Sequence, residues 1–99
     1  MMKSEKQLQE YFKKGLEGAG CLVFKFSSES RRGVPDLMVI PSDGKVFFAE
    51  MKSEKGRGVL SKLQIHQIAK IRAQGVDVFI VDNVNYADCI IRSVSLGTL

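Results

Sequence analysis

The segment Val46–Lys52 constrains the fold of this chain more than any other. Its first four residues are apolar, which is typical of a strand that is covered on both faces. Side chains alternate across a strand, so Glu50 and Lys52 share one face and Met51 lies on the other. A carboxylate and an ammonium group at the end of such a strand indicate a functional site, although an ordinary salt bridge is the commoner explanation for a lone pair.

A second carboxylate, Asp36, stands fourteen residues before Glu50, at the start of the apolar run 35–40. The intervening sequence 41–44 (Pro-Ser-Asp-Gly) favours a hairpin turn, so the two strands should pair in antiparallel fashion. That pairing would bring Asp36 close to Glu50 and Lys52. Two carboxylates on adjoining strand ends suit Mg²⁺ or Mn²⁺, which prefer oxygen ligands. The constellation therefore predicts divalent-metal phosphodiester hydrolysis, in which Lys52 aligns the attacking water.

The rest of the chain predicts an α/β fold in a single domain that spans residues 1–99. Two capping-box sequences, which begin at Ser4 and Ser61, each predict a helix. The expected elements are helices over 4–17 and 61–74, further strands over 21–26 and 77–82, and a short final helix before a frayed end at 95–99. Because a helix joins the last two strands, they should be parallel neighbours.

Composition narrows the class of protein. The net charge of +4 is compatible with a polyanionic partner. Cys21 and Cys89 lack zinc-like spacing and are expected to be reduced core thiols. No apolar run approaches the roughly 18–20 residues of a membrane span, and no signal peptide is evident. The sequence thus predicts an intracellular protein with no membrane partner.

Basic residues are densest between Lys52 and Arg72, where six of them accompany a single acid, Glu54. With the loop before Asp36, this region predicts a rim that binds phosphate groups. Lys70 and His66 are expected on the solvated side of their helix, and a DNA contact for His66 stays open. The predicted nucleic-acid-binding residues are Arg31, Arg32, Lys55, Arg57 and Lys62. Phe24, Phe26 and Tyr86 are assigned to the core rather than to base stacking.

Two further polar residues are candidates for the site. Gln64 falls within the apolar stripe of its helix, where a buried amide needs partners. It either closes the capping box onto Ser61 or contacts the charged pair, and the two roles are compatible. On the first helix, Glu5 lies beside the apolar stripe whereas Glu10 points away, so Glu5 is better placed to reach the site.

These residues resemble the motif of PD-(D/E)xK nucleases. The strings 33–37 (Gly-Val-Pro-Asp-Leu), 50–52 (Glu-Met-Lys) and 58–64 (Gly-Val-Leu-Ser-Lys-Leu-Gln) together resemble a VRR-NUC domain of the type that stands alone in phage and bacterial proteins. The resemblance implies a restriction-endonuclease-like αβββαβ core, with a mixed central sheet flanked by helices and a short C-terminal helix. It also implies a metal-dependent, structure-selective endodeoxyribonuclease that acts on Holliday junctions or other branched DNA as a homodimer. A phage-encoded protein in a bacterial host would fit this type.

Carried over to this chain, the resemblance makes Asp36 and Glu50 ligands of Mg²⁺ or Mn²⁺, joined by the carbonyl of Met51. It makes Lys52 the catalytic lysine, Gln64 the polar residue of the following helix and Glu5 the acid of the first helix. Met51 departs from the family pattern, in which a β-branched or small residue is expected, and should affect packing rather than chemistry.

Two other functions stay open from the sequence. One is a catalytically silent nucleic-acid-binding module on the same fold, and the other is a small scaffold with a fortuitous charge cluster. For the expected homodimer, Ile90 and Ile91 on the last helix are the predicted interface, on the assumption that they are exposed.

Overall fold

A computed structural model describes residues 2–56 and 58–99 and confirms the predicted order of elements. Its centre is one four-stranded sheet in the spatial order β1-β2-β3-β4. The strands are β1 (Leu22–Lys25), β2 (Leu37–Ile40), β3 (Phe47–Met51) and β4 (Val78–Val81). Strand β2 pairs antiparallel with both β1 and β3, whereas β4 runs parallel to β3. The mixed α/β sheet is therefore as predicted.

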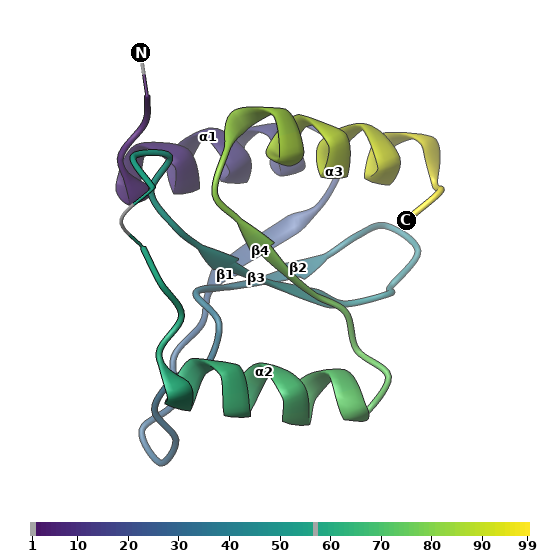
Figure 1. The fold of residues 1–99 in the computed structure, drawn as a ribbon. Coiled ribbons are helices and arrows are strands. Elements are labelled where there is room, and N and C mark those ends of the chain that lie inside the picture. Colours follow the sequence, from purple (N-terminus) through teal and green to yellow (C-terminus); the bar gives the residue numbers. More distant parts are fainter. Residues whose placement is uncertain (1, 57) are drawn as a thin grey trace.

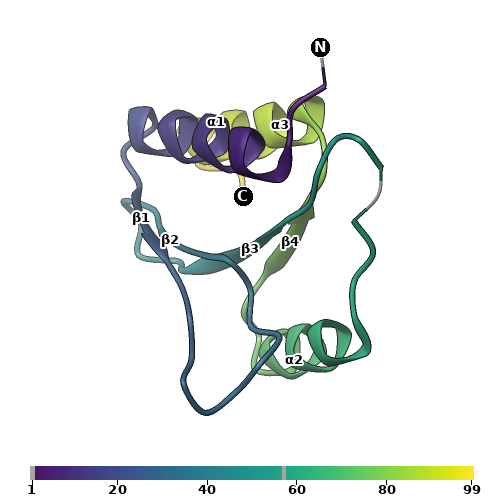
Figure 2. The same ribbon diagram turned by 90° about the vertical axis from the view of Figure 1, so that its left-hand side faces the viewer.

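Three helices cover the sheet in two unequal layers (Figures 1 and 2). Helices α1 (Glu5–Gly18) and α3 (Val84–Leu96) lie on one face, and α2 (Lys62–Ala73) lies on the other. Parallel strands need a crossover connection, and α2 provides it between β3 and β4. Within the part of the chain that the structure describes, no helix is long and apolar enough to cross a membrane.

The main core lies between the sheet and the α1/α3 layer. Leu8, Phe12 and Leu16 recur at helical spacing on α1 and are fully buried. They pack against side chains from one face of the sheet, namely Leu37, Val39, Phe47, Ala49, Met51 and Val81. This burial fixes the register of the strands, because a slip by one residue would expose the whole set.

The opposite layer is thinner. Ile68 is the buried residue of α2, and the helix lies over the β4 side of the sheet. Leu22 and Phe24 on β1 are 60% and 51% exposed. The core assignment of Phe24 is therefore wrong, because no described helix covers β1 on this side. Tyr86, which is 39% exposed on the first turn of α3, was also wrongly assigned to the core.

The last helix differs from its prediction. It has 13 residues and continues to Leu96, where Gly97 ends it with a φ of 68°. Ile90 is only 3% exposed, and Ile91 packs against the core. The predicted exposed interface at these two residues is therefore wrong. Helix α3 lies against α1, where a Cβ on Gly15 would collide with the Ile91 side chain, so both isoleucines face inward.

The two cysteines differ in burial. Cys21 is buried in the core, as predicted, but Cys89 is exposed on the outer side of α3. Both are free thiols.

Candidate active site

The pairing of β2 with β3 brings the two predicted carboxylates together. Leu37 lies opposite Ala49, so the next residues outward along the two strands, Asp36 and Glu50, meet at the same end of the sheet. Asp36 is held in place because its Oδ2 accepts a hydrogen bond of 2.8 Å from the backbone N–H of Met51. The Met51 side chain is fully buried on the other face, as the strand alternation predicts.

Among the described residues, Glu50 is the only charged residue that is buried, with 2% of its surface exposed. Its Oε2 accepts a hydrogen bond of 2.8 Å from Nε2 of Gln64 and lies 3.4 Å from Nζ of Lys52. Its Oε1 is buried and has no hydrogen-bond partner among the described residues. Because a buried polar atom without a partner is costly, this oxygen indicates a position where a ligand is expected.

The electrostatics of Glu50 are unusual for a glutamate. Burial raises its pKa from 4.5 to about 7, and repulsion by the Asp36 carboxylate acts in the same direction. Lys52 opposes this rise in pKa through its charge and its hydrogen bond. The charge of Glu5 on the first helix makes the smallest of the contributions that raise the pKa of Glu50.

Gln64 fulfils both of the roles that the sequence leaves open. Its Oε1 accepts a 2.9 Å hydrogen bond from the Ser61 backbone N–H, and its own N–H donates to Ser61 Oγ at 3.1 Å, which completes a capping box. The same Oε1 accepts a 3.3 Å hydrogen bond from Lys52 Nζ, while Nε2 donates to Glu50. One amide therefore fixes the start of α2 and links it to both charged residues of β3.

Two glycines permit close approaches around this network, and the sequence analysis gave them no structural role. Gly33 has a φ of +81°, and a Cβ there would lie 2.8 Å from the carbonyl carbon of Leu63 in α2. A Cβ on Gly58 would lie 2.8 Å from Cδ of Lys52. Both glycines lie within the strings 33–37 and 58–64 that resemble a VRR-NUC domain. Their close contacts form only in the folded chain, so no local sequence pattern indicates them.

Glu54 is a third residue whose role the sequence does not indicate. Its two carboxylate oxygens accept 2.8 Å hydrogen bonds from the backbone N–H groups of Lys3 and Val84, and these bonds lower its pKa. Its own N–H donates to the Lys3 carbonyl at 3.1 Å. Glu54 thus ties the segment after Lys52 to the start of α1 and the start of α3. Its one signal in the sequence is that it is the lone acid in a basic region.

The predicted nucleic-acid-binding residues are dispersed, because Lys62 begins α2 whereas Lys55 follows Glu54, which is bound to the starts of α1 and α3. Arg31, Arg32, Lys55 and Lys62 are all exposed, and Arg57 lies outside the described residues. Arg72 has a structural contact instead, because its guanidinium donates a 2.6 Å hydrogen bond to the Val78 carbonyl.

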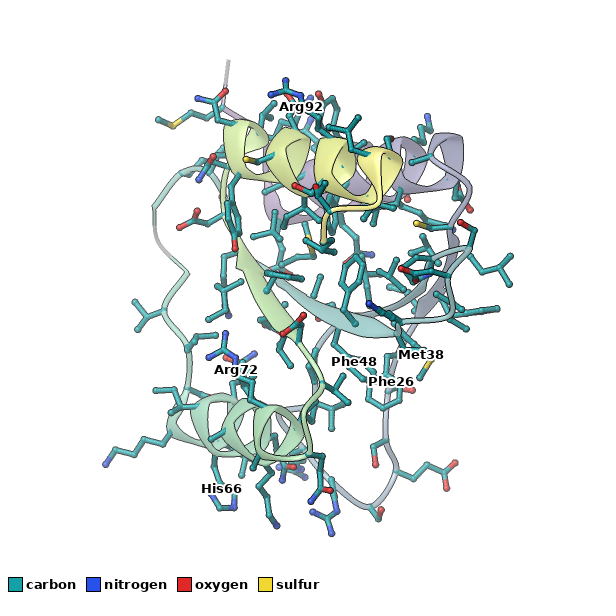
Figure 3. All side chains as sticks on the ribbon, turned by 90° about the vertical axis from the view of Figure 1, so that its right-hand side faces the viewer. Phe26, Met38, Phe48, His66, Arg72 and Arg92 are labelled. Atoms are coloured by element: carbon teal, nitrogen blue, oxygen red, sulfur yellow. The ribbon has the colours of Figure 1, made fainter. Side chains whose placement is uncertain are left out.

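Figure 3 shows Arg72 directed from α2 toward the sheet, whereas His66 points away from it. The exposed position of His66 agrees with the prediction that it lies on the solvated side of the helix.

The donor set is small but suits a hard divalent cation. Among the described residues, no three His, Cys, Asp or Glu side chains gather into a metal-binding cluster. Asp36 and Glu50 nevertheless offer two adjacent carboxylates, one with a buried oxygen that lacks a partner. Mg²⁺ is commonly held by one or two carboxylates together with water and substrate phosphate. A cation between these groups would also relieve the repulsion that raises the pKa of Glu50.

Comparisons with known proteins point to one family. The VRR-NUC domain family matches residues 3–85 of the chain. A protein of Acyrthosiphon pisum secondary endosymbiont phage 1, named "Putative nuclease p44", is 30% identical over 79 residues, which cover 80% of this chain and 83% of that protein. A solved structure described as a VRR_NUC domain superposes with a TM-score of 0.81 at 34% identity, over 89% of this chain and 94% of its own.

Proposed function

Because this chain belongs to the VRR-NUC domain family, we propose that it is a DNA endonuclease that uses Mg²⁺ or Mn²⁺ to hydrolyse phosphodiester bonds. The nuclease name of the phage relative supports the same class of reaction. The observation that carries the proposal is the pair of carboxylates at the end of the sheet. Glu50 is buried beside Asp36 with an oxygen that lacks a partner among the described residues, and Lys52 and Gln64 contact its other oxygen.

Each residue has a distinct task in this proposal. Asp36 and Glu50 would hold the ion, together with the Met51 carbonyl. When bound, the ion supplies Lewis-acid stabilisation of the charge that develops on the phosphate oxygens. Lys52, whose side chain is 12% exposed, is close enough to solvent to orient the attacking water with the N–H group that its contacts with Gln64 and Glu50 leave.

The remaining polar residues support these groups. Gln64 fixes the positions of the Glu50 and Lys52 side chains relative to each other, because it forms a hydrogen bond with each. Glu5 adds negative charge near the site and thereby favours a cation.

Branched DNA, including Holliday junctions, is the substrate that we propose. A junction presents two equivalent strands, and a small domain with one site cuts both most simply as a symmetric homodimer. Light scattering of the purified protein should therefore give twice the mass of the chain, and a monomeric mass would count against this part of the proposal.

Substitution of Asp36 tests the proposed activity. Asp36→Ala should lower the cleavage rate of a branched substrate roughly a thousandfold, because the ion loses a ligand. DNA binding should be retained, since the basic residues are untouched. Asp43→Ala, which removes an exposed acid in the turn between β2 and β3, is the matched control and should cut normally. The assay compares junctions, flaps, single strands and duplexes with Mg²⁺, with Mn²⁺ and with EDTA.

Two results would overturn the proposal. If the unaltered protein binds these DNAs but leaves all of them intact with either metal, the chain is a binding module on a nuclease fold. If cleavage persists in EDTA or in Asp36→Ala, the carboxylate pair does not hold the ion.

A further inference from the structure

A groove of about 430 Å³ lies on the α2 side of the sheet. Its apolar wall includes Phe26, which follows β1, Phe48 of β3 and Ile71 of α2. The rings of Phe26 and Phe48 are 5.1 Å apart and inclined at 56°, and both remain partly exposed, so Phe26 does not belong to the core to which the sequence assigned it. Figure 3 shows them together with Met38 beneath the sheet, beyond the end of α2. A volume of this order suits a small planar ligand, because ligand sites commonly measure about 300–1,000 Å³.

The charged side chains around this groove are all positive. Arg31 and Lys70 line it from the loop and from α2, and no acid among the described residues lines it. The amides of Gln67 and Gln74 line it as well. Aromatic rings beside cationic groups are the usual means by which proteins hold single-stranded nucleic acid, because bases stack on the rings and phosphates meet the cations. Amides can in addition bind the exposed edge of a base.

The groove also adjoins the candidate active site. Phe48 and Glu50 are two residues apart on β3, so they point to the same face and lie about 7 Å apart along the strand. That distance corresponds to roughly two nucleotide steps of a duplex strand. A strand whose phosphate lies at Glu50 would therefore bring a base near Phe48 only one or two nucleotides away.

We propose that this groove binds an unpaired base of the DNA next to the bond that is cut, an inference that rests on the proposed nuclease function. Phe26 and Phe48 stack against the base, and Arg31 and Lys70 neutralise the flanking phosphates. Selectivity for branched DNA then arises from the need for a base that is already free, because extracting one from a duplex breaks its pairing and stacking.

A second copy of the chain is the competing occupant of this apolar surface. In a two-fold contact through the groove, each copy would bring its own Arg31 and Lys70 to the other. Since none of the described residues that line the groove is acidic, these cations would meet without a partner charge. A polyanionic strand removes that difficulty, so charge complementarity favours DNA.

The test is binding in EDTA, which does not depend on cleavage. The probes are a single-stranded oligonucleotide that carries a fluorescent base analogue and the same oligonucleotide in a duplex. Phe26→Leu keeps an apolar side chain but removes the ring, and it should weaken single-strand binding about tenfold or more. Duplex binding should change little. Phe24→Leu is the matched control, since Phe24 lies two residues away outside the groove and should bind as before.

Two further measurements separate the parts of the inference. The fluorescence of the base analogue should fall on binding to the unaltered protein and not to Phe26→Leu. Arg31→Ala and Lys70→Ala should each reduce the salt slope of single-strand binding by about 0.7.

Equal binding of the single strand by Phe26→Leu and the unaltered protein would overturn the inference. So would a change from dimer to monomer in Phe26→Leu, because the groove would then be a contact between copies. Both results leave the nuclease proposal intact. Conversely, a protein that stacks the base but never cuts DNA would refute the nuclease proposal and retain the groove as a binding site.

Discussion

Glu50 is the residue at which stability and the proposed function conflict most clearly. Its carboxylate is buried near a second carboxylate, and one of its oxygens lacks a partner among the described residues. Lys52 and Gln64 compensate for only the other oxygen. Strain of this kind is common where a protein holds charges ready for a ligand, because the ligand relieves what the fold alone does not.

This conflict predicts a specific dependence of stability on pH. Since the folded pKa of Glu50 is about 7 and its ordinary value is 4.5, the folded protein binds a proton that the unfolded chain releases in this range. The free energy of unfolding should therefore fall as the pH rises from about 4.5 to about 7, by at most about 3 kcal/mol. The stabilising effect of the lowered Glu54 pKa is lost only at more acidic pH.

Urea unfolding of the metal-free protein at several pH values measures this slope. Glu50→Gln should flatten it and should be the more stable protein at pH 8. Glu10→Gln removes the same charge from an exposed position on α1 and should keep the slope. A slope that survives in Glu50→Gln would show that another group causes it.

At the scale of elements, the site depends on how the loop before β2 meets α2. Gly33 allows the loop to approach the backbone of Leu63 and Gln64 closely, and Gln64 in turn binds the charged pair of β3. The loop, the helix and the strand therefore hold one another, so a displacement of α2 should disturb the site without unfolding the core.

Two glycines in similar backbone conformations test this coupling. Gly33 and Gly44 have φ values of +81° and +79°, so an alanine at either position should cost about 1–2 kcal/mol of stability. Only Gly33 has backbone atoms within reach of an added Cβ, whereas Gly44 has nothing within 4 Å. Gly33→Ala should lose more stability than Gly44→Ala in urea unfolding because of this clash, and it alone should lose most of its cleavage rate under conditions where both variants are folded. Equal rates in the two variants would refute the coupling.

The features that sequence analysis predicts well are those set by local geometry. A hairpin turn fixes which residues of β2 and β3 face each other, so the proximity of Asp36 and Glu50 follows from the turn and the alternation. Both roles of Gln64 follow from a capping box at the start of a helix that comes soon after Lys52.

The features that it misses depend on how distant elements pack. Glu54 binds backbone groups 51 and 30 residues away, which no local pattern indicates. Ile90 and Phe24 are both apolar, and whether each is covered depends on which face the helices occupy. The sequence therefore predicts elements and the centre of the site, but it does not predict which surfaces remain open.

On the scale of the whole molecule, the sheet divides the protein into layers of unequal strength. Three fully buried side chains anchor α1 on one face, whereas Ile68 is the buried residue of α2 on the other (Figure 2). Segments with few buried apolar contacts open locally at a lower free energy than the global core. Because α2 carries Gln64, one wall of the proposed site belongs to the weaker layer.

Native-state hydrogen exchange should resolve the two layers. The amides in the middle of α2 should exchange through a partial opening, with a free energy below that of global unfolding and little dependence on urea. The amides of α1 around Phe12, together with those of β3, should exchange only when the whole protein unfolds. Ile68→Ala should lower the protection of α2 while leaving that of α1 high, whereas Phe12→Ala should lower both. If α2 instead exchanges at the global rate in the unaltered protein, the two layers form one cooperative unit and the site is as rigid as the core.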